Sequence, residues 1–308
     1  IEHTKKALCD SRVFVLGYGY LGKECTRLFA ALGATVTVYT ENPKELAEAV
    51  LNGYEAKKLT DKPFGVNIML MNPSADEIAK VVVEEGVKVV TTGAGNPEKY
   101  MKEWKEAGIK VIPVVASVAL AKRMEKCGAD AVVAEGTEAG GHIGELTTMV
   151  LVPQVRDAVS IPVIAAGGVA DGRGMAAAFM LGADGVQIGT HFVVTKECIV
   201  HQNYKDCIIK AKDIDTRVTG RSTGHPVRAL RNNLTMEYLK KEAEGASAEE
   251  LEMLAAGGLR KAVVDGDTRT GSLMAGQSAG LVKEECTCKE FIERITAEAT
   301  ALMGKKVD

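Results

Sequence analysis

Short runs of β-branched residues alternate with amphipathic stretches along most of this chain, and the alternation constrains the fold more than any other feature. Eight such runs predict strands at 12–16, 35–39, 64–70, 87–91, 110–114, 131–134, 162–166 and 185–188. The stretches between them have the apolar spacing of helices, at 21–32, 44–58, 75–85, 97–107, 117–126, 148–159 and 173–181. Strands that alternate with helices in this way form parallel sheets.

The number of units favours a closed barrel over an open sheet. An open doubly wound sheet usually has about six strands, whereas a (β/α)8 TIM-type barrel needs eight. We therefore predict an α/β fold in which residues 1–196 form a (β/α)8 barrel. Residues 197–269 carry few strand signals, and we expect them to be a helical substrate lid that includes a solvated helix starting near Ser247. Residues 270–308 are expected to pack back on the barrel, with a last helix from Cys286 to Met303.

Composition argues against several classes of function. The formal net charge is −3 and there is no basic run, so we expect no nucleic-acid partner. No stretch is apolar and long enough to span a bilayer, so we expect no membrane partner. Seven cysteines without regular spacing favour reduced thiols, and we expect a cytoplasmic protein. Cys286 and Cys288 form a C-x-C pair without a nearby histidine pair, so we predict no metal site.

Glycines follow the last two predicted strands, at the end where the active sites of barrels lie. Gly167 and Gly168 come after strand 162–166, and Gly189 and Thr190 come after strand 185–188. Backbone N–H groups beside glycines bind a dianion without help from Lys or Arg. Tight turns alone would explain one such pair, but two pairs in adjacent loops, with the Thr190 hydroxyl as a donor, favour a phosphate-bearing cofactor.

His142 is the candidate catalytic residue. It lies in the segment 135–144, E-G-T-E-A-G-G-H-I-G, which directly follows a predicted strand. We interpret this segment as a loop in which glycines let the backbone approach a planar ligand while one imidazole points at it. A buried structural histidine is the alternative. We interpret His191 as structural and His225, in T-G-H-P, as a turn residue.

Five motifs together identify a resemblance that covers the chain from residue 60 to its end. They are V-T-T-G-A-G-N-P (90–97), A-E-G-T-E-A-G-G-H-I-G-E-L-T-T-M (134–149), I-P-V-I-A-A-G-G-V-A-D-G (161–172), G-V-Q-I-G-T-H-F-V (185–193) and G-S-L-M-A-G-Q (271–277). This part closely resembles the FMN-dependent enoyl-acyl-carrier-protein reductases of bacterial fatty-acid synthesis, which belong with the nitronate monooxygenase-like flavoproteins.

The resemblance implies an FMN-containing barrel that uses NAD(P)H to reduce trans-2-enoyl thioesters carried on acyl carrier protein. His142 would polarise the thioester oxygen or supply a proton at the α-carbon, since an imidazole near neutral pH can do either. A homodimer is also compatible with the resemblance. The implied cofactor contacts are Asn67, Gly93, Glu135, Gly140, Gly141, Gly167, Gly168, Gln187, Gly189, Thr190, Met274, Gly276 and Gln277.

The first 60 residues depart from this family. Residues 17–22 are G-Y-G-Y-L-G, a G-x-G-x-x-G between a predicted strand and a predicted helix, so residues 12–58 resemble a Rossmann-type NAD-binding βαβ unit, with Glu41 as a late ribose-binding candidate. We expect this unit to supply the first two barrel strands and to close the barrel at eight. The alternative is a small separate Rossmann-like lobe beside a six-stranded remainder with open edges. Either arrangement suggests a chimera, natural or engineered.

The function that follows is FMN-dependent enoyl-acyl-carrier-protein reduction by NAD(P)H. We expect weakened FMN affinity and reduced activity, because Tyr18 and Tyr20 would lie where the family has small residues beside the flavin. One alternative is nitronate monooxygenase-type oxidation, in which the same histidine acts as a base. Another is a fold chimera without catalytic activity. The sequence L-T-T-M after His142 and the T-G-H-P turn favour the reductase.

Overall fold

The computed structural model describes residues 12–16, 35–39, 55–57 and 64–304. The chain divides into two compact units, the first made of residues 1–66, 73–90 and 107–109 and the second of residues 67–72, 91–106 and 110–308. The division crosses strands β4 (Gly65–Met69) and β5 (Val89–Gly93), whose carboxyl-terminal parts belong to the second unit.

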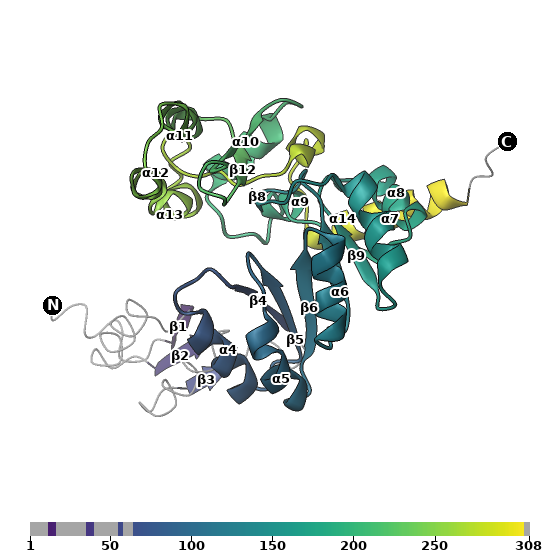
Figure 1. Cartoon of the computed structure of the whole chain (residues 1–308). Helices are drawn as coiled ribbons and strands as arrows, with labels where there is room; N and C mark the ends of the chain where they lie inside the picture. The colour runs from purple at the N-terminus through teal and green to yellow at the C-terminus, as the bar shows by residue number, and fades with distance from the viewer. Residues whose placement is uncertain (1–11, 17–34, 40–54, 58–63, 305–308) are drawn as a thin grey trace. The chain divides into compact units, whose positions relative to one another are not determined.

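Three parallel strands form a sheet of their own in the first unit, in the order β1–β2–β3 (Figure 1). Strands β1 (Arg12–Leu16) and β2 (Thr35–Tyr39) match the predicted ranges. Strand β3 (Glu55–Lys57) does not, because these residues belong to the predicted helix 44–58, and that prediction was wrong at its end. The remainder of that helix, the predicted helix 21–32 and the G-x-G-x-x-G segment lie outside the described residues.

The described strand pairings do not contain the predicted eight-stranded closure. Strand β3 pairs with β2, so the edge of β2 that a closed barrel would use is already occupied. The other sheet has six strands, in the order β10–β9–β7–β6–β5–β4. The described strand order therefore matches the alternative prediction, which was a small Rossmann-like sheet beside a six-stranded sheet. The physical reason is that β3, a third parallel strand, pairs with that edge of β2.

The six-stranded sheet confirms the predicted βα alternation. Pairings β6–β7, β7–β9 and β9–β10 are parallel, so the carboxyl ends of these strands lie along one edge. Each of the strands and helices lies within about two residues of its predicted range. The strands are β6 (Lys110–Val115), β7 (Val132–Glu135), β9 (Val163–Ala166) and β10 (Gly185–Gln187). The helices are α4 (Ala75–Glu84), α5 (Glu98–Glu106), α6 (Val118–Lys126), α7 (Thr148–Ala158) and α8 (Gly172–Met180).

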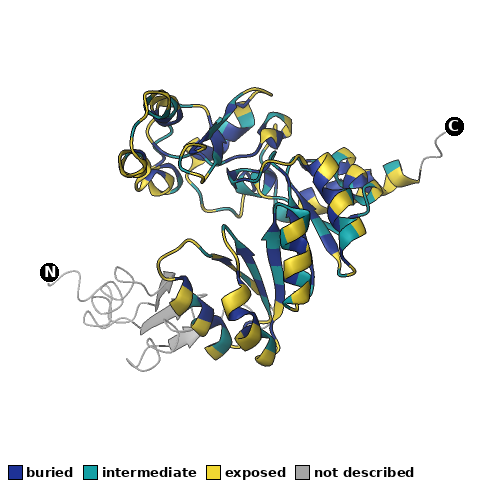
Figure 2. Ribbon diagram, viewed as in Figure 1, coloured by how far each residue is buried: buried dark blue, intermediate teal, exposed yellow. Residues whose placement is uncertain are grey.

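The core of the second unit lies between the sheet and its helices. Val132, Val133 and Ala134 are consecutive and all buried, which is typical of a parallel strand covered on both faces. Helices α6 and α7 pack on β7, and their outer faces are exposed (Figure 2). Apolar burial of this kind contributes about 25 cal/mol for each Å² removed from water, so it is the main source of stability here.

The cap, residues 197–269, contains a β-hairpin that the sequence did not predict. Strands β11 (Thr216–Thr219) and β12 (Val227–Leu230) are antiparallel, and β12 also pairs with β8 (Gly141–His142). The T-G-H-P turn connects β11 to β12, as predicted, and Gly224 there has φ +77°. The cap helices are α10 (Gln202–Lys210), α11 (Asn233–Ala243), α12 (Ala248–Ala255) and α13 (Gly258–Val263). Ser247 caps α12, as predicted.

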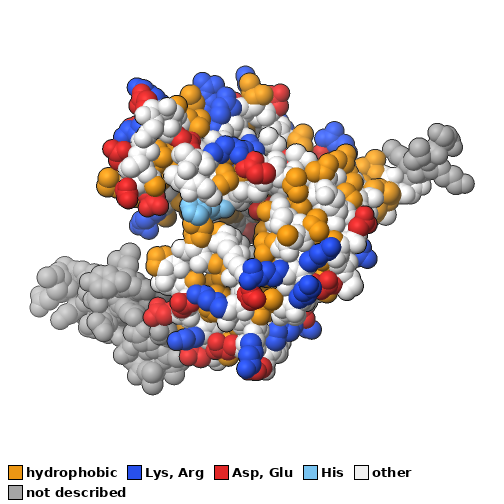
Figure 3. Space-filling model, in the orientation of Figure 1, with side chains coloured by type: hydrophobic (Ala, Val, Ile, Leu, Met, Phe, Trp, Pro, Cys, Tyr) orange, Lys and Arg blue, Asp and Glu red, His pale blue; other side chains and the backbone are white. Residues whose placement is uncertain are grey.

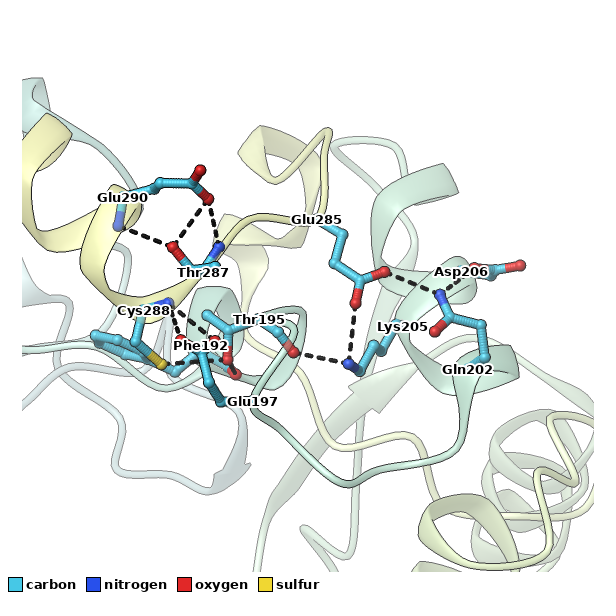
Figure 4. Close-up of polar contacts among 10 residues, drawn as sticks. All are labelled: Phe192, Thr195, Glu197, Gln202, Lys205, Asp206, Glu285, Thr287, Cys288 and Glu290. Carbon is cyan, nitrogen blue, oxygen red and sulfur yellow. Dashed lines mark hydrogen bonds and ion pairs between the residues drawn. The ribbon is translucent and has the colours of Figure 1, made fainter.

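Polar contacts join the C-terminal segment to α10 of the cap and to Glu197 (Figure 4). Short helices α9 (Thr190–Val193) and η1 (Gln277–Leu281) precede helix α14 (Cys288–Met303), which packs along α8. The buried Lys205 ammonium donates to the Thr195 carbonyl at 2.7 Å and lies 3.2 Å from Glu285. Lys205 therefore joins α10 to the segment that leads into α14.

Charge distribution, helix hydropathy and possible metal ligands can be described for residues 64–304. Lys and Arg side chains are interspersed with Asp and Glu on the face shown in Figure 3. Among residues 64–304, no helix is both long and apolar enough to cross a bilayer. The same residues contain no cluster of three or more His, Cys, Asp and Glu side chains that could hold a metal ion.

Candidate functional site

A cavity of about 200 Å³ lies at the carboxyl ends of β7, β9 and β10, within the second unit. Glu135 ends β7, Gly167 follows β9, and Gly189 follows β10, so neighbouring parallel strands bring these three positions together. Ten of the thirteen predicted cofactor contacts line it: Glu135, Gly140, Gly141, Gly167, Gly168, Gln187, Gly189, Thr190, Met274 and Gly276. Residues from three loops and from the C-terminal segment therefore converge on one space.

Three predicted cofactor residues and the predicted catalytic histidine do not line this cavity. Asn67 lies in the middle of β4, where the Thr91 hydroxyl of β5 donates to Asn67 Oδ1 at 2.9 Å, and Gly93 ends β5. Gln277 begins η1, directly after the cavity residue Gly276, and its side chain is exposed. His142 follows Gly141, which does line the cavity.

The segment 135–144 is fixed from three directions, because hydrogen bonds join it to α7, to the C-terminal segment and to the cap. The Glu138 carboxylate accepts from the Thr148 N–H at 2.9 Å and from the Thr148 hydroxyl at 2.9 Å. The Glu138 carbonyl accepts from the N–H of Gln277 at 2.9 Å. On the cap side, the buried Arg228 donates to the Thr137 carbonyl at 3.1 Å. A segment held in this way is preorganised to contact a ligand.

Two glycines show why larger residues do not fit in this wall. A Cβ at Gly140 would lie 2.6 Å from the carbonyl carbon of Ala275, so only glycine allows the C-terminal segment to approach so closely. Gly167 has φ +95°, and a Cβ there would lie 2.9 Å from the Gly136 carbonyl oxygen. The two glycines therefore allow these loops and the C-terminal segment to pack closely around the cavity.

The donors in the cavity fit a phosphate. Within the described part of the chain, the backbone N–H groups of Gly168 and Gly189 make no hydrogen bond, and a Cβ at Gly189 would point into open space. The Thr190 hydroxyl accepts from the Gly276 N–H at 2.9 Å, and its own hydrogen remains available for an anion. Free N–H groups and a hydroxyl are the groups that bind a phosphate dianion without a cation. The residues present therefore fit the phosphate end of FMN.

Glu135 is the acidic group of this cavity. Burial at the end of β7 raises the pKa of its carboxyl to about 7, because desolvation disfavours the charged form. At neutral pH the residue therefore exists in both protonation states, and the neutral form can donate a hydrogen bond to a ligand. The sequence placed Glu135 among the cofactor contacts, but it did not indicate that the carboxyl would titrate near neutrality.

His142 lies in a short strand and not in the loop that the sequence predicted. It pairs with Val227 of β12, and this pairing ties the histidine to the cap hairpin. The ring is half-buried, and burial lowers the pKa of His142, with a further lowering from the neighbouring His225. A neutral imidazole has one N–H donor and one acceptor nitrogen, which suits general acid–base chemistry. The backbone pairing was missed because a two-residue strand has no periodic signal.

His191 has the structural role that the sequence predicted. It is 4% exposed and stacks on Phe291 with ring centroids 3.7 Å apart. Its Nε2 lies 3.7 Å from Cys286 Sγ, and burial lowers the pKa of His191. His225 is exposed in the hairpin turn, also as predicted.

The sequence missed two residues that organise the site, Glu138 and Arg228. Each anchors segment 135–144 through hydrogen bonds to backbone or hydroxyl groups. A signal for Arg228 existed, because one arginine within the apolar run P-V-R-A-L is typical of a buried charge with specific partners.

Comparison with known proteins establishes the family. Residues 32–298 match the family model described as nitronate monooxygenase. The chain belongs to the nitronate monooxygenase family. A relative in Rhodococcus jostii strain RHA1, named (3aS,4S,5R,7aS)-5-hydroxy-7a-methyl-1-oxo-octahydro-1H-indene-4-carboxyl-CoA dehydrogenase, is 34% identical over 87% of this chain and 84% of its own length. A probable nitronate monooxygenase of Staphylococcus saprophyticus is 37% identical over 73% of this chain and 66% of its own length.

Solved structures within the family extend the comparison to the fold. FabK from Thermotoga maritima is 46% identical with a TM-score of 0.78, and the match covers 97% of this chain and 96% of FabK. A mutant of the same protein is 52% identical with a TM-score of 0.72, over 85% of this chain and 81% of the mutant. Nitroalkane oxidase from Streptomyces ansochromogenes is 26% identical with a TM-score of 0.69, over 86% and 88% of the two chains.

Proposed function

We propose that this protein is an FMN-dependent enoyl-acyl-carrier-protein reductase that takes its electrons from NAD(P)H. The observation that carries the proposal is the cavity at the ends of β7, β9 and β10, where ten predicted flavin contacts converge. Support comes from 46% identity to FabK over nearly the whole chain. The general class is that of flavin-dependent oxidoreductases. The proposal adds three specific points, which are the enoyl thioester substrate, its carrier protein and the nicotinamide electron donor.

The described residues have separate roles in this scheme. Gly168, Gly189 and Thr190 would hold the phosphate of FMN through N–H and hydroxyl donors. Glu135 and Met274 would line the remainder of the cavity. Bound FMN would supply hydride transfer between the nicotinamide and the β-carbon of the enoyl group.

His142 would act on the substrate. Its neutral imidazole would donate a hydrogen bond to the thioester oxygen or provide the proton for the α-carbon. The lowered pKa of His142 favours the neutral form at pH 7, and pairing with Val227 holds the residue in place. General acid–base assistance of this kind is worth about 10²–10⁴-fold in rate.

The finer assignment of the fold is also part of the proposal. We infer that the six-stranded sheet corresponds to consecutive strands of the (β/α)8 barrel implied by the family resemblance, with residues 197–269 as a substrate lid and residues 270–308 as a closing segment. Support comes from the parallel βα order of the sheet and from the TM-score of 0.78 to FabK.

Replacement of His142 tests the mechanism. In His142→Ala, turnover of crotonyl thioester should fall by about 10²-fold or more, while NAD(P)H-driven reduction of the flavin stays nearly unchanged. Stopped-flow absorbance separates the two half-reactions. His201→Ala is the matched control, because His201 is an exposed histidine that caps α10. Unchanged crotonyl turnover in His142→Ala would remove this residue from the mechanism.

Nitronate oxidation is the second candidate, because the family model and a Staphylococcus relative have that name. In that reaction His142 would act as the base, and oxygen would accept the electrons. Parallel assays with crotonyl thioester plus NAD(P)H and with a nitronate plus oxygen distinguish the two. The primary proposal predicts that kcat/KM for the thioester exceeds that for the nitronate. The reverse order would select the oxidase.

A further inference from the structure

A second cavity lies within the cap, separate from the cavity at the strand ends. Its volume is about 500 Å³, within the roughly 300–1,000 Å³ of small-molecule pockets. Its walls come from the end of α10, the end of β12 and the first turn of α11, which lie together in Figure 1. No residue lines both cavities. The cap cavity plays no part in the proposed flavin chemistry.

Two cationic side chains line this cavity. The Arg231 guanidinium forms no ion pair or hydrogen bond within the described part of the chain. Lys210 has only an exposed partner, Asp206, at 3.8 Å, and such a surface pair is worth little. Both charges are therefore available to an anion, and a guanidinium matches two phosphate oxygens at once.

Two amide side chains and one carboxylate also line the cap cavity, near Lys210 and Arg231. Asn232 is already engaged, since its amide donates to the Thr268 carbonyl at 3.0 Å and the Gly271 carbonyl at 2.7 Å. The neighbouring Asn233 amide makes no hydrogen bond among the described residues. Asp215 Oδ2 accepts from the Lys212 N–H at 2.8 Å, and a carboxylate has a second oxygen for a ligand hydroxyl. A ligand with hydroxyl and amide-like groups matches this wall.

The floor of the cap cavity is apolar. Met236 supplies its exposed apolar surface, and Leu230 and Leu273 are buried behind it. A flat heteroaromatic ring gains from contact with such side chains, and methionine adapts to its shape. A simple fatty acid would leave Asp215 and Asn233 facing an acyl chain, which costs free energy.

We propose that the cap cavity binds a nucleoside monophosphate. The phosphate binds Lys210 and Arg231, the ribose hydroxyls bind Asp215, and the base lies on the exposed Met236 side chain. The site is independent of the flavin cavity, although it is adjacent to it. Leu273 lines the cap cavity, and the next residue, Met274, lines the cavity at the strand ends. Met274 forms a β-bridge with Ala229, so the backbone here is extended. Successive side chains of an extended backbone point to opposite sides.

Calorimetric titration with adenosine 5′-monophosphate tests the proposal, carried out on the full chain in the presence of saturating FMN. One site should be observed. Arg231→Gln and Lys210→Gln should each weaken binding by about tenfold, the loss expected for a charge-assisted hydrogen bond. Arg260→Gln is the matched control, because Arg260 is an exposed arginine on α13 that does not line the cavity. Binding to this control should equal that of the unmodified protein.

Several results would overturn the proposal. One is the absence of binding heat with adenosine 5′-monophosphate, and another is unchanged affinity in Arg231→Gln with its fold verified by circular dichroism. Equal affinity for inorganic phosphate would show that no nucleoside is recognised. Competition between adenosine 5′-monophosphate and FMN would place the nucleotide in the cavity at the strand ends. None of these results depends on whether the protein reduces enoyl thioesters.

Discussion

Single side chains set the protonation chemistry of the site. Glu135 and His142 come from the same segment, but burial shifts their pKa values in opposite directions. It raises the pKa of the Glu135 carboxyl to about 7 and lowers the pKa of the His142 imidazole. Both side chains can therefore be neutral near pH 7. A neutral carboxyl can donate a proton and a neutral imidazole can accept one, so segment 135–144 contains both an acid and a base.

The Glu135 carboxyl should make stability depend on pH. Its pKa rises from 4.5 to about 7 on folding, so the folded protein binds more protons than the unfolded chain between these values. Stability is therefore complete below about pH 4.5 and falls as pH rises toward 7. At pH 8, Glu135→Gln should be more stable than the unmodified protein by about 2 kcal/mol. This is less than the free energy that corresponds to the whole pKa shift, because the carboxyl is not completely buried. Equal stability of the two proteins in urea at about pH 4, below both pKa values, is the control, and equal stability at pH 8 would refute the assignment.

His225 should influence the titration of His142. Burial is the larger cause of the lowered pKa of His142, and the charge of His225 is the smaller one. His225→Gln should therefore raise the pKa of His142 while leaving it below the usual value. Nuclear magnetic resonance titration of the imidazole C–H signals measures this directly. A decrease of the pKa in His225→Gln would contradict the geometry of the hairpin turn.

Among the elements, the segment before α14 depends on one buried charge. Lys205 is 5% exposed, and Glu285 is its carboxylate partner. Removing one member of a buried pair leaves an uncompensated charge and is strongly destabilising. Glu285→Ala should therefore lower the free energy of unfolding by clearly more than the loss of an exposed ion pair, because it leaves the buried Lys205 ammonium without its carboxylate.

Glu284→Ala is the matched control for this experiment. Glu284 is the neighbouring residue, and its partner Arg294 is also at the surface. Exposed pairs of this kind contribute about 0.2–1 kcal/mol, so the control should change little. Denaturant unfolding of both variants gives the comparison. Equal losses in Glu284→Ala and Glu285→Ala would mean that Lys205 does not anchor the segment.

Element ranges could be predicted from the sequence wherever a periodic pattern was long enough. Helices α4 to α8 and the strands of the six-stranded sheet followed from apolar spacing and from turns, and Ser247 marked the start of α12. The predictions failed at short elements. β3 has three residues and β8 has two, and the hairpin β11–β12 has four residues in each strand, which is too short for a clear alternation.

Several residues that line the cavity at the strand ends could be predicted from the sequence. The glycine pairs after β9 and β10 indicated two loops that line it, because a strand followed by glycine favours a tight turn with accessible backbone N–H groups. Anchoring contacts such as Arg228 to the Thr137 carbonyl link residues 91 positions apart, and no local pattern reveals them. The order of the strands is hidden from local patterns for the same reason, since it depends on which strand pairs with the second edge of β2.

At the scale of the whole molecule, a bound flavin should stabilise the folded chain. A ligand present at a hundred times its dissociation constant adds about 2.7 kcal/mol to the free energy of unfolding. FMN should therefore raise the thermal unfolding temperature, and riboflavin, which lacks the phosphate, should raise it much less. Equal effects of FMN and riboflavin would contradict the phosphate-binding role of Gly168, Gly189 and Thr190.

The central claim is that the cavity at the ends of β7, β9 and β10 holds FMN. The most direct measurement is the visible absorbance of the purified full chain, before and after addition of FMN and removal of the excess. The account predicts a retained flavin band that approaches one equivalent. A protein that unfolds cooperatively but retains no flavin at any FMN concentration would contradict it.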